Sequence, residues 1–228
     1  MRHMALPAAR LLVACALAAS AAVLGPLPAS AQDAEDASRE PLSIVALGDS
    51  LMAGYNLPSA AAFPNVLDRR LDEAGYENVT IVNAGVSGDT ASGGLARLDW
   101  SVPDGTDGVI LELGANDMLR GLDPQLTYEA LDAIIERLEE RDIPVLLAGM
   151  MAARNMGPDY VEAFDAIYPR LAEEHDLVLY PFFLEGALTD PALMLPDGIH
   201  PNQEGVEVMV ENMLPSVITF IERIRGEG

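Results

Sequence analysis

Five short apolar runs, separated by longer amphipathic segments, set the pattern of this chain. A nearly continuous apolar run of this length is typical of a strand buried on both faces of a parallel sheet. Between the runs, apolar residues recur at helical spacing. The predicted strands are residues 42–47, 79–82, 108–113, 143–148 and 177–180, and the predicted helices are residues 64–74, 90–99, 125–141, 159–174 and 201–224.

The regular alternation of strand and helix defines the fold class. Such an order predicts a parallel sheet with right-handed crossovers and helices on both faces. We therefore expect a three-layer α/β/α domain over residues 42–226, with a flavodoxin-like, doubly wound, five-stranded parallel sheet. Pro215 lies inside the predicted terminal helix, where its missing N–H and its ring predict a kink or a split.

Glycine and small polar residues follow three consecutive predicted strands. They occupy residues 48–50, 83–90 and 114–117. Because the carboxyl ends of parallel strands lie at one edge of the sheet, where ligands bind, these residues predict a single site. Ser50 is the candidate nucleophile there, although Asp-Ser after Gly is also ordinary turn chemistry.

A serine nucleophile needs a base, and downstream of residue 31 the chain has only two histidines. His175 ends a predicted helix among acidic residues, which indicates a solvated imidazolium favoured by the helix dipole. His200 lies in a loop three residues after Asp197, so the carboxylate can reach Nδ1 while Nε2 points outward. By elimination His200 is the candidate base, and a helix N-cap turn made by Asp197 or Asn202 is the alternative that the local sequence leaves open.

The amino-terminal 31 residues have the pattern of a secretory signal. Arg2 and Arg10 precede an apolar stretch at residues 11–24, and Ala29-Ser30-Ala31 forms a cleavage site. The sequence therefore predicts an exported protein, periplasmic or secreted, cleaved near Ala31. The polar, acidic residues 32–41 are expected to form a flexible leader.

Cys15 is the single cysteine, and it lies inside this signal. Residues 12–15 resemble a lipoprotein-processing box, but Arg10 leaves almost no apolar stretch before it and the apolar run continues beyond it. Lipidation is therefore the disfavoured alternative. Cleavage would leave a chain without disulfides.

The composition and net charge of the chain limit the kinds of partner that it can bind. Hydrophobic residues make up 50% and charged residues 21% of the 228, which excludes a disordered chain. The formal net charge is −23, and such a surface should repel nucleic acid and anionic lipid. After the signal no apolar run is long enough for a spanning helix, so stable membrane insertion is not expected. We expect a monomer or weak oligomer that acts on a small molecule.

Four blocks of sequence resemble the SGNH (GDSL) hydrolases. They are GDSL at 48–51, Gly88 within SGDT, GAND at 114–117 and DGIHPN at 197–202. Further matching stretches extend the resemblance over nearly all of residues 42–220. Within that superfamily the chain is similar to the exported bacterial thioesterase/lysophospholipase/arylesterase type.

The resemblance implies a role for each block. Ser50 would be the nucleophile, His200 the general base and then acid, and Asp197 the carboxylate that orients it. The backbone N–H groups of Ser50 and Gly88 and the side-chain amide of Asn116 would form the oxyanion hole. The implied activity is hydrolysis of short- to medium-chain acyl esters, aryl esters, acyl thioesters or lysophospholipids through an acyl-enzyme, with no cofactor and no metal.

Two other functions stay open: a carbohydrate-directed acetyl esterase of the same superfamily and a non-catalytic periplasmic binding module on the same fold. An α/β-hydrolase is disfavoured because Met52 stands where the G-x-S-x-G elbow needs its second glycine, and because the acid and the histidine share one loop. A metal hydrolase is disfavoured because two unclustered histidines and no available cysteine leave only carboxylates.

The substrate side is predicted from flexible apolar residues near the strand ends. We expect Met118, Leu119, Met150 and Met151 to bind the acyl chain, since methionine adapts to chains of varying shape. The alternative for Met150 and Met151 is that they only pack in the core. Phe63 stands where relatives of this type have Trp, and it is also expected on the acyl or leaving-group side.

Overall fold

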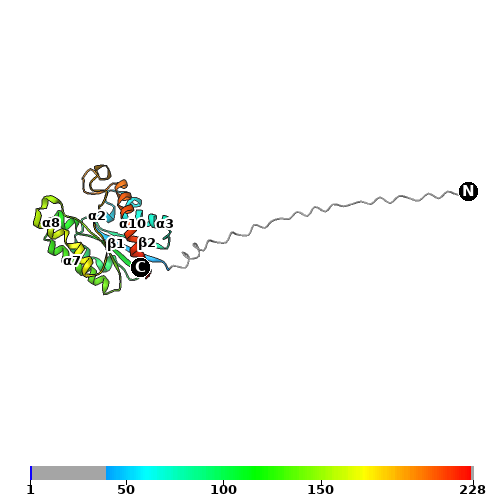
Figure 1. Ribbon diagram of the computed structural model, residues 1–228, viewed down its shortest axis with the longest axis horizontal. Coiled ribbons are helices and arrows are strands. Elements are labelled where there is room, and N and C mark those ends of the chain that lie inside the picture. The colour runs from blue at the N-terminus through cyan, green and yellow to red at the C-terminus, as the bar shows by residue number, and fades with distance from the viewer. Residues whose placement is uncertain (2–39, 227–228) are drawn as a thin grey trace.

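The computed structural model describes Met1 and residues 40–226, and its framework is a five-stranded parallel sheet (Figure 1). The spatial order β2-β1-β3-β4-β5 is the flavodoxin-like order, so the predicted fold class is confirmed. The predicted signal peptide beyond Met1, and the leader up to residue 39, lie outside the described residues. The strands are β1 (Leu42–Gly48), β2 (Val79–Gly85), β3 (Gly108–Glu112), β4 (Val145–Ala148) and β5 (Val178–Tyr180).

Helices cover both faces of the sheet. Figure 1 places α3 and α10 on one side and α7 and α8 on the other. Within residues 40–226 no helix combines the length and the apolar character needed to cross a bilayer. The α-helices are α2 (Ser50–Ala53), α3 (Phe63–Glu73), α4 (Ala91–Ala96), α5 (Leu98–Ser101), α6 (Ala115–Leu119), α7 (Pro124–Glu139), α8 (Pro158–Asp165), α9 (Ile167–Glu174) and α10 (Gln203–Arg225), and 3₁₀ turns occupy Ser59–Ala61, Arg154–Met156 and Pro191–Leu193.

The first strand is the centre of the fold. Residues 44–47 of β1 are at most 1% exposed, as expected for a strand covered on both faces. At its carboxyl end Gly48 pairs with Gly85 of β2 on one side and with Glu112 of β3 on the other. Since the order of strands reverses at β1, the residues that follow Gly48 lie at the switch point where ligands of such sheets bind.

The helix α10 continues through Pro215 from Gln203 to Arg225, so the predicted split is wrong. The backbone bond that Pro215 cannot make would go to Glu211, which is exposed and can bond to water. Met213 and Val217 are fully buried on either side of the proline and hold the helix on the sheet.

Two other predicted helices are each divided in the structure. The segment 159–174 breaks at Ala166 into α8 and α9, three residues before Pro169, which cannot donate to the Asp165 carbonyl. The segment after Thr90 breaks at Arg97 into α4 and α5. Thr90 caps α4 by accepting a hydrogen bond from the Gly93 N–H.

His175 joins two helices and is less solvated than expected. Its side chain is 13% exposed, and its ring nitrogens lie 2.8 Å from Asp132 and 3.1 Å from Glu139, both on α7. Burial by itself lowers the pKa of His175, but hydrogen bonds to the two carboxylates and their charges together outweigh burial and raise it. The imidazolium therefore links the end of α9 to α7.

We expect His175→Ala to destabilise the protein by on the order of 1 kcal/mol at pH 5.5 and by less at pH 9. A folded-state pKa above the unfolded value gives stability that is fully present below the unfolded pKa and is lost as pH rises through the folded pKa. Urea unfolding of both proteins at the two pH values measures the difference. An equal loss at both pH values would show that the charge of His175 contributes nothing.

Candidate active site

Ser50 lies where β1 turns sharply into a single helical turn. Asp49 caps this turn, since its Oδ1 accepts a hydrogen bond from the Leu51 N–H at 2.9 Å. Gly54 ends it in the left-handed conformation at φ 75°. The serine is 9% exposed, so its hydroxyl is largely enclosed and fixed at the carboxyl edge of the sheet.

A chain of hydrogen bonds links Ser50, His200 and Asp197. The Ser50 Oγ lies 2.9 Å from His200 Nε2, and His200 Nδ1 lies 2.8 Å from Asp197 Oδ2. Tyr55 packs against the imidazole with ring centroids 4.4 Å apart. The three polar side chains are therefore arranged so that the imidazole can receive the serine proton at one nitrogen while the carboxylate holds the other.

The Asp197 carboxylate is fixed by its own loop. Its Oδ1 accepts hydrogen bonds from the N–H groups of Ile199 at 2.9 Å and His200 at 3.0 Å. These backbone bonds, that of His200 first, lower the pKa of Asp197 to about 2, which keeps it ionised at neutral pH. Asn202 caps α10 through a bond from the Gly205 N–H. The loop thus contains both local turns that the sequence suggested, in addition to the contact with the imidazole.

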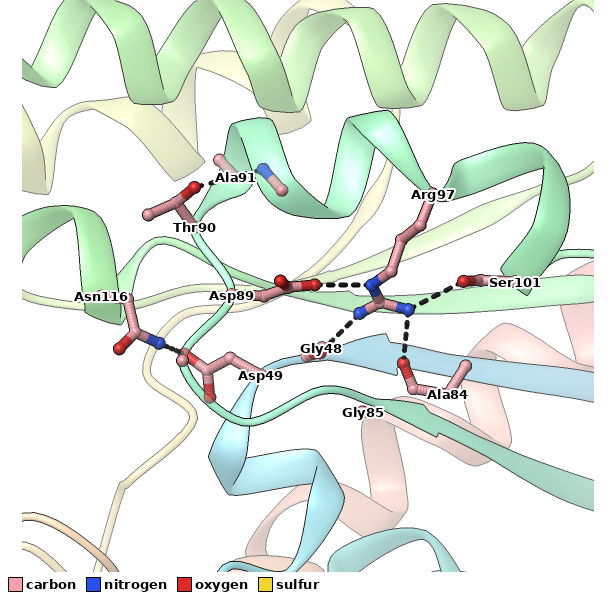
Figure 2. A network of polar contacts seen from close by, with 12 residues as sticks. Gly48, Asp49, Ala84, Gly85, Asp89, Thr90, Ala91, Arg97, Ser101 and Asn116 are labelled. Atoms are coloured by element: carbon pink, nitrogen blue, oxygen red, sulfur yellow. Dashed lines mark hydrogen bonds and ion pairs between the residues drawn. The ribbon is translucent and has the colours of Figure 1, made fainter.

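The three candidate oxyanion-hole residues come from the ends of three adjacent strands. Asn116 is the second residue of α6, which follows β3, and its Nδ2 donates to Asp49 Oδ2 at 2.8 Å (Figure 2). Gly88 lies in the loop after β2 with φ 87°, and its carbonyl accepts from Arg120 Nη2 at 2.6 Å. Ser50 and Asn116 line the same pocket, whereas Gly88 is not among the residues that line it.

Two buried carboxyl groups behind Ser50 were missed by the sequence analysis. Asp49 and Glu112 are both fully buried, and Glu112 Oε2 accepts from the Asp49 N–H at 3.2 Å. Burial raises the pKa of Asp49 to about 6 and that of Glu112 well above its ordinary value. The sequence signal was a lone acidic residue inside the apolar run 108–113.

The candidate site opens into an apolar pocket of about 550 Å³. Met118, Leu119, Met150 and Met151 all line it, as do Ser50, Asn116 and His200. Met118 and Met150 are buried, whereas Leu119 and Met151 are exposed at 53% and 40%. Met118 and Met150 thus belong to both the core and the pocket wall, whereas Met151 belongs to the pocket wall alone.

The prediction that Phe63 lies on the acyl or leaving-group side is wrong. Phe63 is fully buried at the start of α3 and packs edge to face on Phe183, with ring centroids 4.6 Å apart. It does not line the pocket, because the apolar face of α3 is directed into the core.

Ser50 is hydrogen-bonded to an imidazole that is in turn hydrogen-bonded to a carboxylate, at the switch point of a doubly wound sheet and beside an apolar pocket. This is the arrangement of a serine hydrolase. Residues 46–208 match the model of the GDSL-like Lipase/Acylhydrolase family. The chain belongs to this family and is a serine ester hydrolase.

Named relatives agree with this assignment. The chain is 40% identical over 186 residues to an arylesterase of Vibrio mimicus, covering 81% of this chain and 92% of the relative. It is 41% identical over 163 residues to thioesterase 1/protease 1/lysophospholipase L1 of Escherichia coli K12, covering 71% and 76%. Its structure is similar to that of AlinE4, an SGNH-hydrolase family esterase, with a TM-score of 0.67, 44% identity and coverage of 80% and 98%.

The backbone conformation of the segment that leads to Asn116 depends on Gly114. This glycine has φ 116°, and a Cβ atom there would overlap the hydroxyl of Tyr168, which donates to the Leu113 carbonyl at 2.9 Å. Asp117, next to Asn116, is fixed by bonds from the Ala91 N–H and the Thr127 hydroxyl. The segment before Asn116 therefore has one conformation that only glycine satisfies.

Gly114→Ala should destabilise the protein by more than Gly105→Ala does. Gly105 also has a positive φ, 85°, but has no atom within 4 Å of a Cβ, so its variant reports backbone strain alone, about 1–2 kcal/mol. Chemical unfolding of the two variants measures the extra cost of displacing Tyr168. Equal losses would mean that the hydroxyl moves aside freely.

Proposed function

We propose that this protein hydrolyses short- to medium-chain acyl esters and thioesters, with Ser50 as nucleophile, His200 as general base and acid, and Asp197 as the orienting carboxylate. One observation carries the proposal: an unbroken hydrogen-bonded chain from Ser50 Oγ through His200 to Asp197, next to the apolar pocket. Aryl esters, acyl thioesters and lysophospholipids are the substrate classes that the names of the relatives suggest.

In acylation, Ser50 Oγ attacks the acyl carbonyl carbon while His200 Nε2 takes the hydroxyl proton. The carbonyl oxygen becomes an oxyanion, and the tetrahedral intermediate collapses as His200 gives the proton to the departing alcohol or thiol. In deacylation, water is deprotonated by His200 and attacks the acyl-serine, and the proton returns to Ser50 as the carboxylic acid leaves. Asp197 favours the proton on Nδ1 throughout and stabilises the imidazolium.

The oxyanion would be bound by the N–H groups of Ser50 and Gly88 and by the Asn116 amide. The bond from Asn116 to Asp49 occupies one amide hydrogen and sets the direction of the other. Each donor of this kind contributes about 2.7–4 kcal/mol to transition-state stabilisation.

We further propose that the protein is exported after cleavage near Ala31 and acts as a monomer or weak oligomer without a nucleic-acid partner. The signal-like pattern of residues 1–31 supports export, and the net charge of −23 supports the absence of a nucleic-acid partner.

Ser50→Ala and His200→Ala should each lower kcat on a p-nitrophenyl ester by roughly 10⁴-fold or more without lowering the unfolding midpoint appreciably. Asp197→Asn should lower kcat less than His200→Ala, because a poorly oriented imidazole still accepts a proton. His175→Ala is the matched control and should keep its kcat. Retained turnover in Ser50→Ala or His200→Ala would contradict the assignment.

The pocket predicts how rate depends on acyl length. If the acyl chain lies along Met118 and Met151, each methylene removed from water contributes up to about 0.8 kcal/mol until the pocket is full. We therefore expect kcat/KM to rise from acetyl to medium chains and then to level or fall.

The p-nitrophenyl ester series from about two to sixteen carbons tests this in wild type, Met118→Ala and Met151→Ala. The substitutions should flatten the rise. Met209→Ala is a control for a buried methionine that does not line the pocket. An acetyl-peaked profile that neither pocket substitution changes would favour a carbohydrate-directed acetyl esterase instead.

A further inference from the structure

Arg97, at the break between α4 and α5, makes four hydrogen bonds, three of them to the active-site edge and the fourth to Ser101 of α5 (Figure 2). The side chain is only 15% exposed. Its donors reach Asp89 Oδ2 from Nε at 2.5 Å, the Ala84 carbonyl and the Ser101 hydroxyl from Nη1 at 2.8 Å each, and the Gly48 carbonyl from Nη2 at 2.9 Å.

Three of the acceptors lie at or just beyond the ends of two strands. Gly48 ends β1 two residues before Ser50, and Ala84 is the penultimate residue of β2. Asp89 directly follows Gly88 in the loop after β2. The Gly48 carbonyl also accepts from the Val86 N–H at 3.0 Å. One guanidinium therefore connects the strand that carries the nucleophile to the loop that carries Gly88.

Only arginine has the donor geometry for this position. Its planar group presents five N–H donors in a fixed fork, whereas lysine offers a compact charge on a flexible stem. The Asp89 carboxylate is itself only 20% exposed, so it needs a fixed cationic partner. The pair holds Asp89 toward the strand ends and away from solvent.

We infer that Arg97 is a positioning residue that sets the place of the Gly88 N–H relative to Ser50, and so forms the oxyanion hole indirectly. The inference rests on the proposed function of Ser50 and Gly88. Oxyanion donors act only when their position is preorganised, and a displacement of about 1 Å can cost 10²-fold in rate.

The loop is fastened at other points, so it should shift without unfolding when Arg97 is removed. The Gly88 carbonyl accepts from Arg120, and the Ala91 N–H donates to Asp117. Arg97 does not line the pocket, so binding of the acyl chain should not depend on it. Both chemical steps pass through an oxyanion, and the expected signature is a loss in kcat with KM preserved.

The experiment compares Arg97→Gln with wild type on a p-nitrophenyl ester. We expect kcat to fall roughly 10- to 100-fold, with KM changed by less than about threefold. The inhibition constant of an alkyl trifluoromethyl ketone, whose serine adduct carries an oxyanion, should weaken by the same factor as kcat. Binding of the free fatty acid, which carries no such adduct, should be unchanged.

Arg137→Gln is the matched control. Arg137 also ties α5 in place, through an exposed ion pair with Asp99 at 2.5 Å, and within residues 40–226 its polar contact is to that helix and not to a strand end. Its variant should keep wild-type kcat. If Arg97→Gln does not fold, Asp89→Asn removes the charge of the same pair from the loop side and should lower kcat in the same way.

Folded Arg97→Gln and Asp89→Asn proteins with wild-type kcat would overturn the inference. So would a fall in kcat that leaves the affinity for the trifluoromethyl ketone unchanged, or an equal fall in Arg137→Gln. Turnover by Ser50→Ala would instead overturn the proposed function. An inactive Ser50→Ala together with a fully active Arg97→Gln would overturn the positioning role alone.

Discussion

The site depends on the two hydrogen bonds that the buried Asp49 carboxylate accepts. One oxygen accepts from the Leu51 N–H and thereby starts the helical turn that presents Ser50, and the other accepts from the Asn116 amide. The same group therefore orients residues that follow two different strands. Burial raises its pKa to about 6, and hydrogen bonds from Leu51 and Asn116 act against that rise.

The neighbouring loop is held by the opposite charge. Arg97 reaches the carbonyl that ends β1 and the carboxylate beside Gly88. A buried anion on the β3 side of Ser50 and a largely buried cation on the β2 side thus fix the two flanks of the nucleophile. Such groups contribute more to position than to stability, because removing a charge from water offsets much of the attraction gained.

The sequence by itself determined the sheet and the composition of its carboxyl edge. Apolar runs such as residues 44–47 need cover on both faces, and regular alternation with amphipathic helices permits few topologies. Ser50 and Asn116 were expected at this edge because they follow predicted strands. His200 was expected to act with Ser50 because it lies three residues after Asp197 in a loop. The local pattern was sufficient to predict which residues lie at this edge, because parallel strands all end at the same edge of the sheet.

Tertiary structure decided what depends on contacts between distant residues. Pro215 does not split α10, although its local preference favours a break, because buried neighbours hold the helix on the sheet. Phe63 faces Phe183 and not the pocket, since the direction of a side chain follows from helix packing. Glu112 lies within a predicted strand and Arg97 within a predicted helix, and the sequence does not show which distant backbone groups their side chains reach. Those long-range bonds form only when the β1, β2 and β3 ends meet in the folded sheet.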